Sequence, residues 1–536
     1  MNQARAPRLH PGNLRFLAFT VLLLPAISSL SQEVQHLSIP VTGGMPGMPI
    51  MTGIERTTNG LKVMWDGPPG YYRLLQKMGL NEGNWQVVGS PTLERQATIT
   101  QLHSNAFFRV SGPTPAYAGA QACIECHGDI HNSEMDTRHA KALDTLKKIN
   151  QDKNPSCLPC HTVGYGLPSG FDEKNPNRAH LAGVQCESCH GPAANHAASE
   201  FDFTVRPRAD IASTVCGGCH TGSHHPTYGE WTTSDHATVT RANMNANSCG
   251  RCHIGSARLA MLNGETPPQN DRNIGIVCIS CHDPHGRHVF TNVLTGLVYT
   301  NQLRNPVSST NDYFLTTSDV FATKYNPNIN LCAQCHNHRG AAWTSNGSAP
   351  HHSPQYNMLL GTVGELASGT AKGQPSSHAT KLDKQCVTCH MQTEEYVSED
   401  HPAVTGHSFN VESFDTCRSC HPSPEMLTDF VQSSVSSQIQ EIKAYLDIWA
   451  ATRAPLELWT NYGTRSWEFT SPGSLSSGGP GPTASQQTNS IPANIRKARY
   501  NIYVVLYDGS YGVHNGRFAI SLLENARTWV AQELEK

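Results

Sequence analysis

Between residues 52 and 113, short apolar segments alternate with polar residues and are separated by turn sequences such as Asp66-Gly67-Pro68-Pro69-Gly70. This pattern is typical of strands in a small all-β domain. We therefore predict a small β-sandwich over residues 52–113, preceded by a linker at 32–51. The predicted strands are Leu61–Trp65, Tyr71–Leu75, Trp85–Val88, Ala97–Leu102 and Phe107–Val110.

The C-terminal region, residues 426–536, has apolar residues at helical spacing. We predict one helix over Met426–Thr452, a second from near Ile491 with Pro492 in its first turn, and a third over Gly516–Glu535. The Ser/Gly/Pro-rich stretch 471–491 is expected to be a loop.

The first 31 residues have the pattern of a signal peptide. Three arginines precede an apolar run from Phe16 to Leu30, and small residues stand before Gln32. The run is short for a bilayer span, which takes about 20 residues. We therefore predict export with cleavage near residue 31, rather than an uncleaved anchor, and no membrane span in the mature chain.

The composition excludes several classes of function. The formal net charge is −3, which argues against a nucleic-acid partner, and neither a P-loop nor a Gly-rich dinucleotide fingerprint is present. Apolar residues make up 38% of the chain, and Gly and Pro are frequent at 44 and 34 residues. A core built from so few apolar side chains needs another component to help fill it.

All 18 cysteines fall into nine Cys-x-x-Cys-His motifs, with none left over. The cysteine pairs are Cys123 and Cys126, Cys157 and Cys160, Cys186 and Cys189, Cys216 and Cys219, Cys249 and Cys252, Cys278 and Cys281, Cys332 and Cys335, Cys386 and Cys389, and Cys417 and Cys420. The histidines that follow them are His127, His161, His190, His220, His253, His282, His336, His390 and His421.

This motif attaches c-type haem, because two thiols at this spacing form thioethers with one macrocycle and the adjacent histidine becomes the proximal iron ligand. Disulfides, zinc sites and redox Cys-x-x-Cys pairs do not need a histidine after the second cysteine. Nine repeats that use every cysteine therefore predict nine covalently attached haem c groups.

Successive motifs begin only 29 to 54 residues apart, too close for a separate protein core around each haem. We expect residues 118–425 to be one nine-haem domain with the macrocycles as its core. The predicted fold is mainly α and irregular, with the β-sandwich at its N-terminus and the helical region at its C-terminus.

Nineteen histidines remain, and 15 of them lie between residues 123 and 421. This concentration favours bis-His coordination, which is typical of electron transfer and leaves no site for a substrate. His351 is preferred to His352, His285 is expected to reach a neighbouring haem, and His131 and His225 are expected at the surface or behind the ligands. The predicted distal ligands are His139, His196, His236, His285, His351, His378 and His407, whereas His514 either belongs to a helical cap or points into the haem stack, and the C-terminal resemblance described below favours it as the eighth ligand.

Residues 120–196 resemble the tetrahaem cytochrome c-554 family. The similarity is carried by Arg138-His139-Ala140-Lys141-Ala142, by Cys157 to Gly166 and by Gly183 to Pro192, and the motif at Cys216 completes the module. The family has three bis-His haems and one five-coordinate haem, which corresponds to the second motif. The resemblance thus implies an open iron face at His161, with His139 and His196 serving haems other than the nearest one.

The C-terminal region is similar to the helical tail of pentahaem nitrite reductases, in which a Gly-x-His turn supplies a distal ligand. Here Gly512-Val513-His514 occupies that position. Those reductases have a lysine in place of one proximal histidine, and no motif of this chain does. Nitrite reduction of that type is therefore disfavoured.

These features favour a periplasmic or extracellular electron carrier that acts between redox partner proteins or terminal electron acceptors. Two alternatives stay open. One is an oxidoreductase that acts on a small nitrogen or sulfur compound at one five-coordinate haem. The other is a polymerising cytochrome, which would form a homo-oligomer with further copies of the same chain. A carrier is favoured over a substrate-converting enzyme.

The haem count gives the first testable prediction. Intact-mass spectrometry of the exported protein should show the mature chain plus nine haem groups, because each motif holds one macrocycle covalently. A matched variant, Cys249→Ala with Cys252→Ala, should lose one haem. A count below nine in the unaltered chain would contradict the assignment of one haem to every motif.

Overall fold

The computed structural model describes residues 36–38, 49–67, 71–78, 85–100, 106–113, 116–199, 201–238, 249–268, 274–291, 298–304, 331–371, 373–382 and 384–536. The predicted signal peptide at 1–31 lies outside these residues. The chain divides into two compact units, Met1–Cys219 and His220–Lys536, and each is described by itself.

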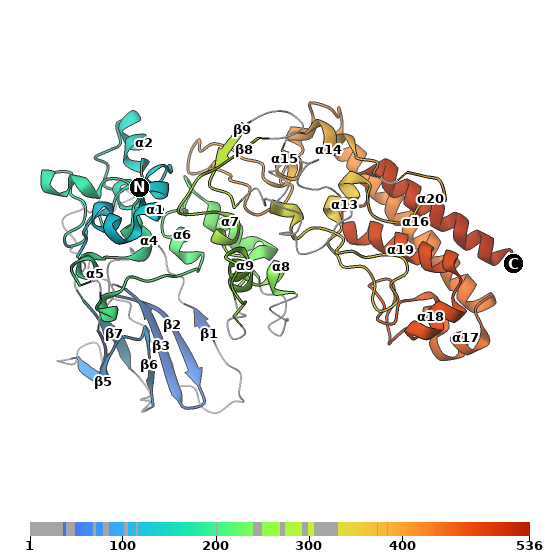
Figure 1. Cartoon of the computed structure of the whole chain (residues 1–536), viewed down its shortest axis with the longest axis horizontal. Helices are drawn as coiled ribbons and strands as arrows, with labels where there is room; N and C mark the ends of the chain where they lie inside the picture. The colour runs from blue at the N-terminus through green and yellow to red at the C-terminus, as the bar shows by residue number, and fades with distance from the viewer. Residues whose placement is uncertain are drawn as a thin grey trace, which may run out of the picture. The chain divides into compact units, whose positions relative to one another are not determined.

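The first unit begins with two small antiparallel sheets (Figure 1). One has the strand order β1-β2-β3-β6 and the other β5-β4-β7. Val63 pairs with Ile54 and Ala97, and Leu74 pairs with Val88 and Val110. The strands are β1 (His36–Ser38), β2 (Ile50–Thr57), β3 (Gly60–Asp66), β4 (Tyr72–Lys77), β5 (Gln86–Thr92), β6 (Gln96–Ile99) and β7 (Phe107–Ser111).

All five predicted strands are present, but the predicted linker is not wholly a linker. β1 lies inside residues 32–51 and β2 begins at Ile50. Glycines and prolines around β2 obscure the alternation of apolar and polar residues that would predict a strand. Pairing with β3 supplies the backbone hydrogen-bond partners that make this segment a strand. The two sheets share one buried cluster centred on Val63, Trp65, Tyr72 and Leu74.

The rest of the first unit consists of short helices joined by turns. They are η1 (Ala120–Cys123), α1 (Ile124–Met135), α2 (Ala142–Lys148), α3 (Leu158–His161), η2 (Pro176–Leu181), α4 (Cys186–His190), α5 (Ala194–Ala198), η3 (Phe203–Val205) and α6 (Thr214–Gly217).

The residues around His139, from Met135 to Ala142, have a sequence pattern that predicts one helix continuing to Ile149, and this prediction is wrong. His139 occupies the turn between α1 and α2, and α2 starts only at Ala142. The carbonyl of His139 accepts a hydrogen bond from the Val184 backbone N–H at 3.0 Å. A tertiary partner thus takes up an acceptor that a continuous helix would use internally.

The second unit starts with a run of short elements. They are α7 (Thr227–Thr233), η4 (Asp235–Ala237), α8 (Gly250–His253), α9 (Gly255–Leu262), α10 (Cys278–Cys281), β8 (His288–Thr291), β9 (Val298–Asn301), α13 (Gln355–Leu360), α14 (Ser377–Lys381), α15 (Cys386–His390) and η6 (Asp415–Cys417).

The C-terminal region packs around α16 (Pro424–Thr452), α19 (Ala493–Asp508) and α20 (Gly516–Leu534), which lie together in Figure 1. α16 buries one stripe that includes Val435, Ile439 and Leu446 against α19 and α20. Each fully buried side chain of this size contributes about 1.5–3 kcal/mol. The three helices agree with the sequence prediction to within two residues at most ends, although Pro492 caps α19 instead of lying in its first turn.

Three smaller elements complete this region: α17 (Leu456–Tyr462), η7 (Gly463–Trp467) and α18 (Ala484–Ser490). The predicted loop at 471–491 is therefore partly wrong, because α18 lies within it. Thr483 and Gln486 form a capping box at the start of α18, in which their side chains accept hydrogen bonds from backbone N–H groups of the first turn. The Ser/Gly/Pro-rich composition of this stretch does not by itself predict that helix.

Arg499 on α19 is fully buried in this region. Its guanidinium donates hydrogen bonds to the carbonyls of Trp467 and Glu468 at 2.9 and 2.7 Å and to Oε1 of Gln487 at 2.6 Å. Burial lowers the pKa of Arg499 to about 9, against the opposing effect of the Glu468 carboxylate.

Replacing this residue should destabilise the C-terminal region. Arg499→Met should lower the free energy of unfolding by about 3 kcal/mol, because three buried acceptors lose their donor. Chemical denaturation followed by far-UV circular dichroism measures this. Arg517→Met, at an exposed position of α20, is the control and should change stability by less than about 0.5 kcal/mol. Equal effects would refute this role for Arg499.

Candidate haem centres

Several Cys-x-x-Cys-His motifs occupy a single helical turn. α4 and α15 each span a whole motif, and α8 and α10 each span most of one. Positions i, i+3 and i+4 share one face of a helix, so both thiols and the imidazole of a motif project to the same side. None of the 18 cysteines is joined in a disulfide. This arrangement fits covalent attachment of one macrocycle to each motif.

The spacing of histidine rings in the second unit matches axial coordination of an iron. Two imidazoles bound to opposite faces of one metal ion at about 2 Å have nitrogens about 4 Å apart and ring centres about 6 Å apart. Five predicted distal histidines lie at this spacing from a motif histidine. The pairs are His236 with His336 at 6.1 Å, His351 with His253 at 6.0 Å, His378 with His421 at 6.1 Å, His407 with His282 at 6.2 Å and His514 with His390 at 6.2 Å.

Hydrogen bonds at Nδ1 orient several of these rings. Nδ1 of His378 lies 3.1 Å from the Val513 carbonyl, and Nδ1 of His390 lies 2.9 Å from the Phe409 carbonyl. Because a carbonyl only accepts, each Nδ1 carries the proton and Nε2 is left with a lone pair for a metal. His161 and His190 are held in the same way by the carbonyls of residues 142 and 208.

His351 and His352 compete for the position opposite His253. Their rings stack 4.2 Å apart, and that of His352 lies 6.5 Å from His253, slightly farther than that of His351. Nδ1 of His351 lies 2.8 Å from Oγ of Ser353, whose hydroxyl donates to the Asn337 carbonyl at 2.7 Å and therefore accepts from the ring. Burial, followed by the charge of His352, lowers the pKa of His351 to about 3, which keeps the imidazole neutral as a ligand must be.

His514 has a carboxylate behind it. Its Nδ1 lies 2.7 Å from Oδ1 of Asp508, whose side chain is only 1% exposed. Burial alone would lower the pKa of His514, but the Asp508 carboxylate outweighs burial and raises it. A carboxylate behind a ligating imidazole fixes its orientation and increases its basicity. Sequence reasoning found His514 but not Asp508, which has no motif of its own.

Glu230 on α7 fixes the loop that carries His407. Its two carboxylate oxygens accept hydrogen bonds from the backbone N–H groups of Thr405 and His407, both at 2.8 Å, and from the Thr405 hydroxyl at 2.7 Å. Burial works against the charge of Glu230, yet these hydrogen bonds lower its pKa overall. Nothing in the sequence around Glu230 indicates this role.

In the first unit, Arg208 joins a haem motif to the β-sheets. Its side chain donates to the Cys189 carbonyl at 2.9 Å and forms an ion pair with Asp66 of β3. Its own carbonyl accepts from Nδ1 of His190 at 2.6 Å. The β region, for which the sequence indicated no chemistry, thus helps to position the third motif.

Contacts between cysteine side chains show which motifs adjoin each other. Hydrogen-bond contacts join the first motif to the third and the second to the fourth in the first unit, and the seventh to both the fifth and the eighth in the second unit. The pairs are Cys123 with Cys186, Cys160 with Cys219, Cys252 with Cys335, and Cys332 with Cys386. Macrocycles attached at these residues would be in close proximity.

Three predicted distal ligands, His139, His196 and His285, stay predictions as to which iron they serve. His139 is held in its turn by the carbonyl contact described above, and Nδ1 of His196 is buried without a hydrogen-bond partner.

His131, which sequence reasoning placed at the surface or behind the ligands, is buried and its Nε2 has no hydrogen-bond partner, so it too could serve an iron. The ring of His225 lies 6.4 Å from that of His220, but only four residues separate them, too few to pass easily around a macrocycle.

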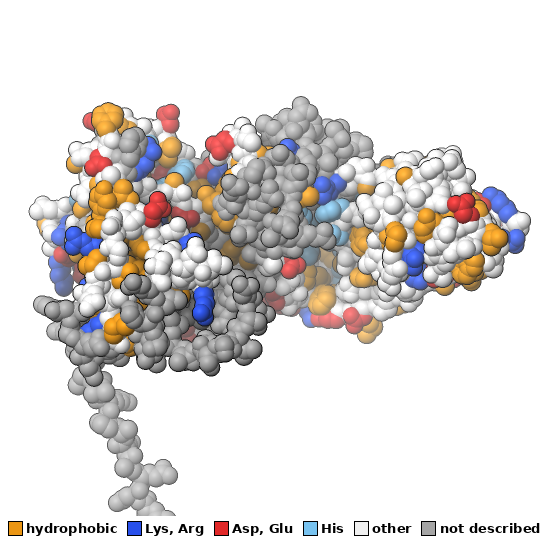
Figure 2. Space-filling model, turned by 90° about the horizontal axis from the view of Figure 1, so that it is seen from below, with side chains coloured by type: hydrophobic (Ala, Val, Ile, Leu, Met, Phe, Trp, Pro, Cys, Tyr) orange, Lys and Arg blue, Asp and Glu red, His pale blue; other side chains and the backbone are white. Residues whose placement is uncertain are grey.

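Charged side chains of both signs lie on the surface. On the face shown in Figure 2, acidic and basic side chains of the described residues are interspersed. No helix in the described part of the chain is long and apolar enough to cross a membrane.

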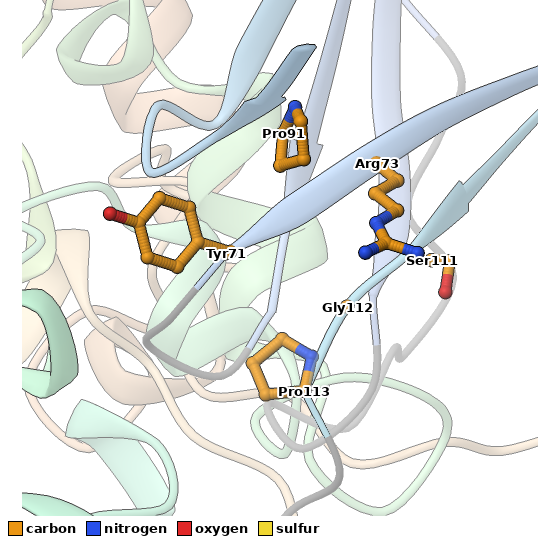
Figure 3. Close-up of a pocket in the computed structure, with 6 residues that line it drawn as sticks. All are labelled: Tyr71, Arg73, Pro91, Ser111, Gly112 and Pro113. Carbon is orange, nitrogen blue, oxygen red and sulfur yellow. The ribbon is translucent and has the colours of Figure 1, made fainter. Parts of the chain in front are cut away.

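An open groove of about 670 Å³ lies on the β-sheets. No cysteine or histidine lines it, so it is not a haem site. Its lining residues, drawn in Figure 3, are Tyr71, Arg73, Pro91, Ser111, Gly112 and Pro113.

Comparison with known proteins agrees with the motif chemistry. The family model described as cytochrome c554 and c-prime matches residues 122–191. Cytochrome c-554 of Nitrosomonas europaea is 31% identical over 137 residues, which cover 19% of this chain and 57% of that protein. The multihaem cytochrome MtrA of Shewanella baltica is 26% identical over 164 residues, which cover 24% of this chain and 46% of that protein. The chain thus spans about half the length of these curated relatives.

Two solved multihaem cytochromes also align with this structure. The outer cell wall cytochrome OcwA aligns with a TM-score of 0.48 and 20% identity, covering 77% of this chain and 99% of that one. The undecahaem cytochrome from the S-layer of Carboxydothermus ferrireducens aligns with a TM-score of 0.44 and 19% identity, covering 79% of this chain and 70% of that one.

The match over residues 122–191 coincides with the first three motifs and includes most of the stretch in which the sequence resembles the tetrahaem family. The chain therefore contains a cytochrome c-554-like haem module over residues 122–191 and is similar to multihaem c-type cytochromes.

Proposed function

We propose that the protein is an exported nonahaem c-type cytochrome that transfers electrons between redox partners through closely packed haems. The observation that carries this proposal is the placement of five histidines at axial spacing from five different motif histidines. Export would follow from the predicted signal peptide, and the partners would be redox proteins or terminal acceptors in the periplasm or outside the cell.

The ligand set follows from this arrangement. Each motif would supply two thioethers and a proximal histidine, and eight other histidines, those predicted from the sequence, would supply distal ligands. When bound, haem supplies an iron that gains and loses one electron. The chain's own contribution is to orient the imidazoles that would bind the iron, as Ser353 does for His351 and Asp508 does for His514.

Adjacent motifs also support a conducting role. Cysteine contacts join motifs 1 and 3, 2 and 4, 5 and 7, and 7 and 8, so groups attached there would exchange electrons over short distances. The two N-terminal sheets would form a small sandwich that serves as a spacer or docking module, and Arg208 couples it to the third motif.

A second candidate function is reduction or oxidation of a small nitrogen or sulfur compound at the second motif. The predicted distal histidines leave one iron open, and the family resemblance points to that of His161. Cys157 packs against an apolar cluster in which the Tyr117 hydroxyl is buried without a hydrogen-bond partner. A buried hydroxyl without a partner, in the same cluster as a cysteine of the second motif, could bind a small polar molecule.

Counting spin states tests the two functions together. Electron paramagnetic resonance of the oxidised protein should show eight low-spin irons and one high-spin iron, since bis-His coordination gives low spin. A potentiometric titration should be reversible over a broad range. Failure to take up electrons reversibly would eliminate the carrier, and a wholly low-spin spectrum without carbon monoxide binding would eliminate the enzyme.

A matched pair of substitutions tests the ligand opposite His253. His351→Ala should convert one low-spin haem to high spin, because it removes the histidine anchored by Ser353. His352→Ala should leave the spin-state count unchanged. If His352→Ala alone produced the high-spin signal, the assignment of His351 would be wrong.

A further inference from the structure

The last haem motif differs from most others in its exposure. Among the 18 cysteines, only Cys126 and Cys420 are exposed, and the other 16 are partly buried. Cys420 belongs to the ninth motif, whose histidine, His421, faces His378 at axial spacing. A macrocycle attached at Cys420 would therefore have one edge close to solvent.

Large apolar side chains are exposed on both sides of this cysteine. Val411, Met426, Leu427 and Phe430 are 44, 73, 43 and 71% exposed. Isolated exposed apolar residues are common, but several of them close in the sequence to one site can mark an interaction surface. These four side chains with Cys420 are called the Cys420 face.

The start of α16 explains why this face is not covered. Met426 and Phe430, four residues apart, lie on the side of the helix away from the buried stripe that begins at Val435, and Leu427 lies to one side of them. Pro422 and Pro424 restrict the short connection between His421 and α16, with Pro424 in the first turn of the helix. The Cys420 face is thus held rigidly beside the motif, which reduces the entropy lost on binding.

The charges around the Cys420 face have one dominant sign. Between residues 411 and 430 there are four acidic residues, Glu412, Asp415, Glu425 and Asp429, and one arginine, Arg418. The Arg418 guanidinium already pairs with Asp415 at 3.2 Å and with Glu425. The rim is therefore acidic, and a second copy docked through the same face would bring like charges together, which is costly.

We propose that the Cys420 face is a docking site for a basic redox protein, which exchanges electrons with the chain at the ninth motif. An apolar centre with a charged rim is the usual composition of a protein interface. Docking would place a partner's redox centre beside the exposed edge, and the transfer is one electron in or out with no bond formed. This inference rests on the proposed electron-transfer function and adds the place and the kind of partner.

The test uses the full haem-loaded protein and mitochondrial cytochrome c, a small basic one-electron acceptor, as the probe. After reduction with dithionite, stopped-flow mixing measures the second-order rate of electron transfer to the probe. Phe430→Ser should lower this rate about tenfold at low salt, as expected for loss of a central interface residue. Leu456→Ser, which alters a 78% exposed leucine on α17, is the matched control and should have no effect.

Three further measurements separate docking from electron flow. Calorimetry with the oxidised probe should show weaker binding for Phe430→Ser and for the charge reversal Asp429→Lys, and the rate for the unaltered protein should fall as salt rises from about 10 to 200 mM. The optical and paramagnetic spectra of Phe430→Ser should match those of the unaltered protein.

Three results would overturn the docking proposal. Equal rates and affinities for Phe430→Ser and Leu456→Ser would show that the probe binds elsewhere. A changed haem spectrum in Phe430→Ser would show that this ring packs on the haem. Self-association that disappears in Phe430→Ser would make a second copy the occupant. A protein that dithionite cannot reduce would instead refute electron transfer itself.

Discussion

Each iron in a bis-His cytochrome must be bound by two imidazoles, and only one of them comes with the attachment motif. The other must arrive from a distant part of the chain and lie with its ring centre about 6 Å from the first. In the second unit, five histidines meet this requirement from short helices, turns and the loop before α20. The tertiary contacts of these segments therefore bring five of the predicted distal histidines to motif histidines.

Polar groups next to these histidines hold them in place. Glu230 ties the loop of His407 to α7, Asp508 holds His514, and Ser353 holds His351. Asp508 and Ser353 leave Nε2 of their histidines available by hydrogen bonding to Nδ1, whereas Glu230 binds the backbone of His407. In the first unit, Arg208 gives the third motif a connection to the β-sheets through Asp66.

The C-terminal helices combine two functions in one element. One stripe of α16 packs into the apolar core with α19 and α20, as ordinary amphipathic helices do. The first turns of the same helix leave Met426 and Phe430 exposed beside the ninth motif. The helical bundle thus provides a rigid support for a surface at which the chain can meet a partner.

The sequence by itself determined the covalent chemistry and the local elements. Spacing alone predicted the attachment cysteines and proximal histidines, because attachment needs residues that are neighbours in the chain. Periodicity located five strands and three helices, since burial of one face imposes it, but it missed α18 and β2, which depend on a capping box and on strand pairing. Which histidine faces which motif, and the roles of Glu230, Asp508 and Arg208, were decided only by the tertiary structure. The reason is physical: these contacts join residues far apart in the chain, and nothing in the local sequence specifies the distance between them.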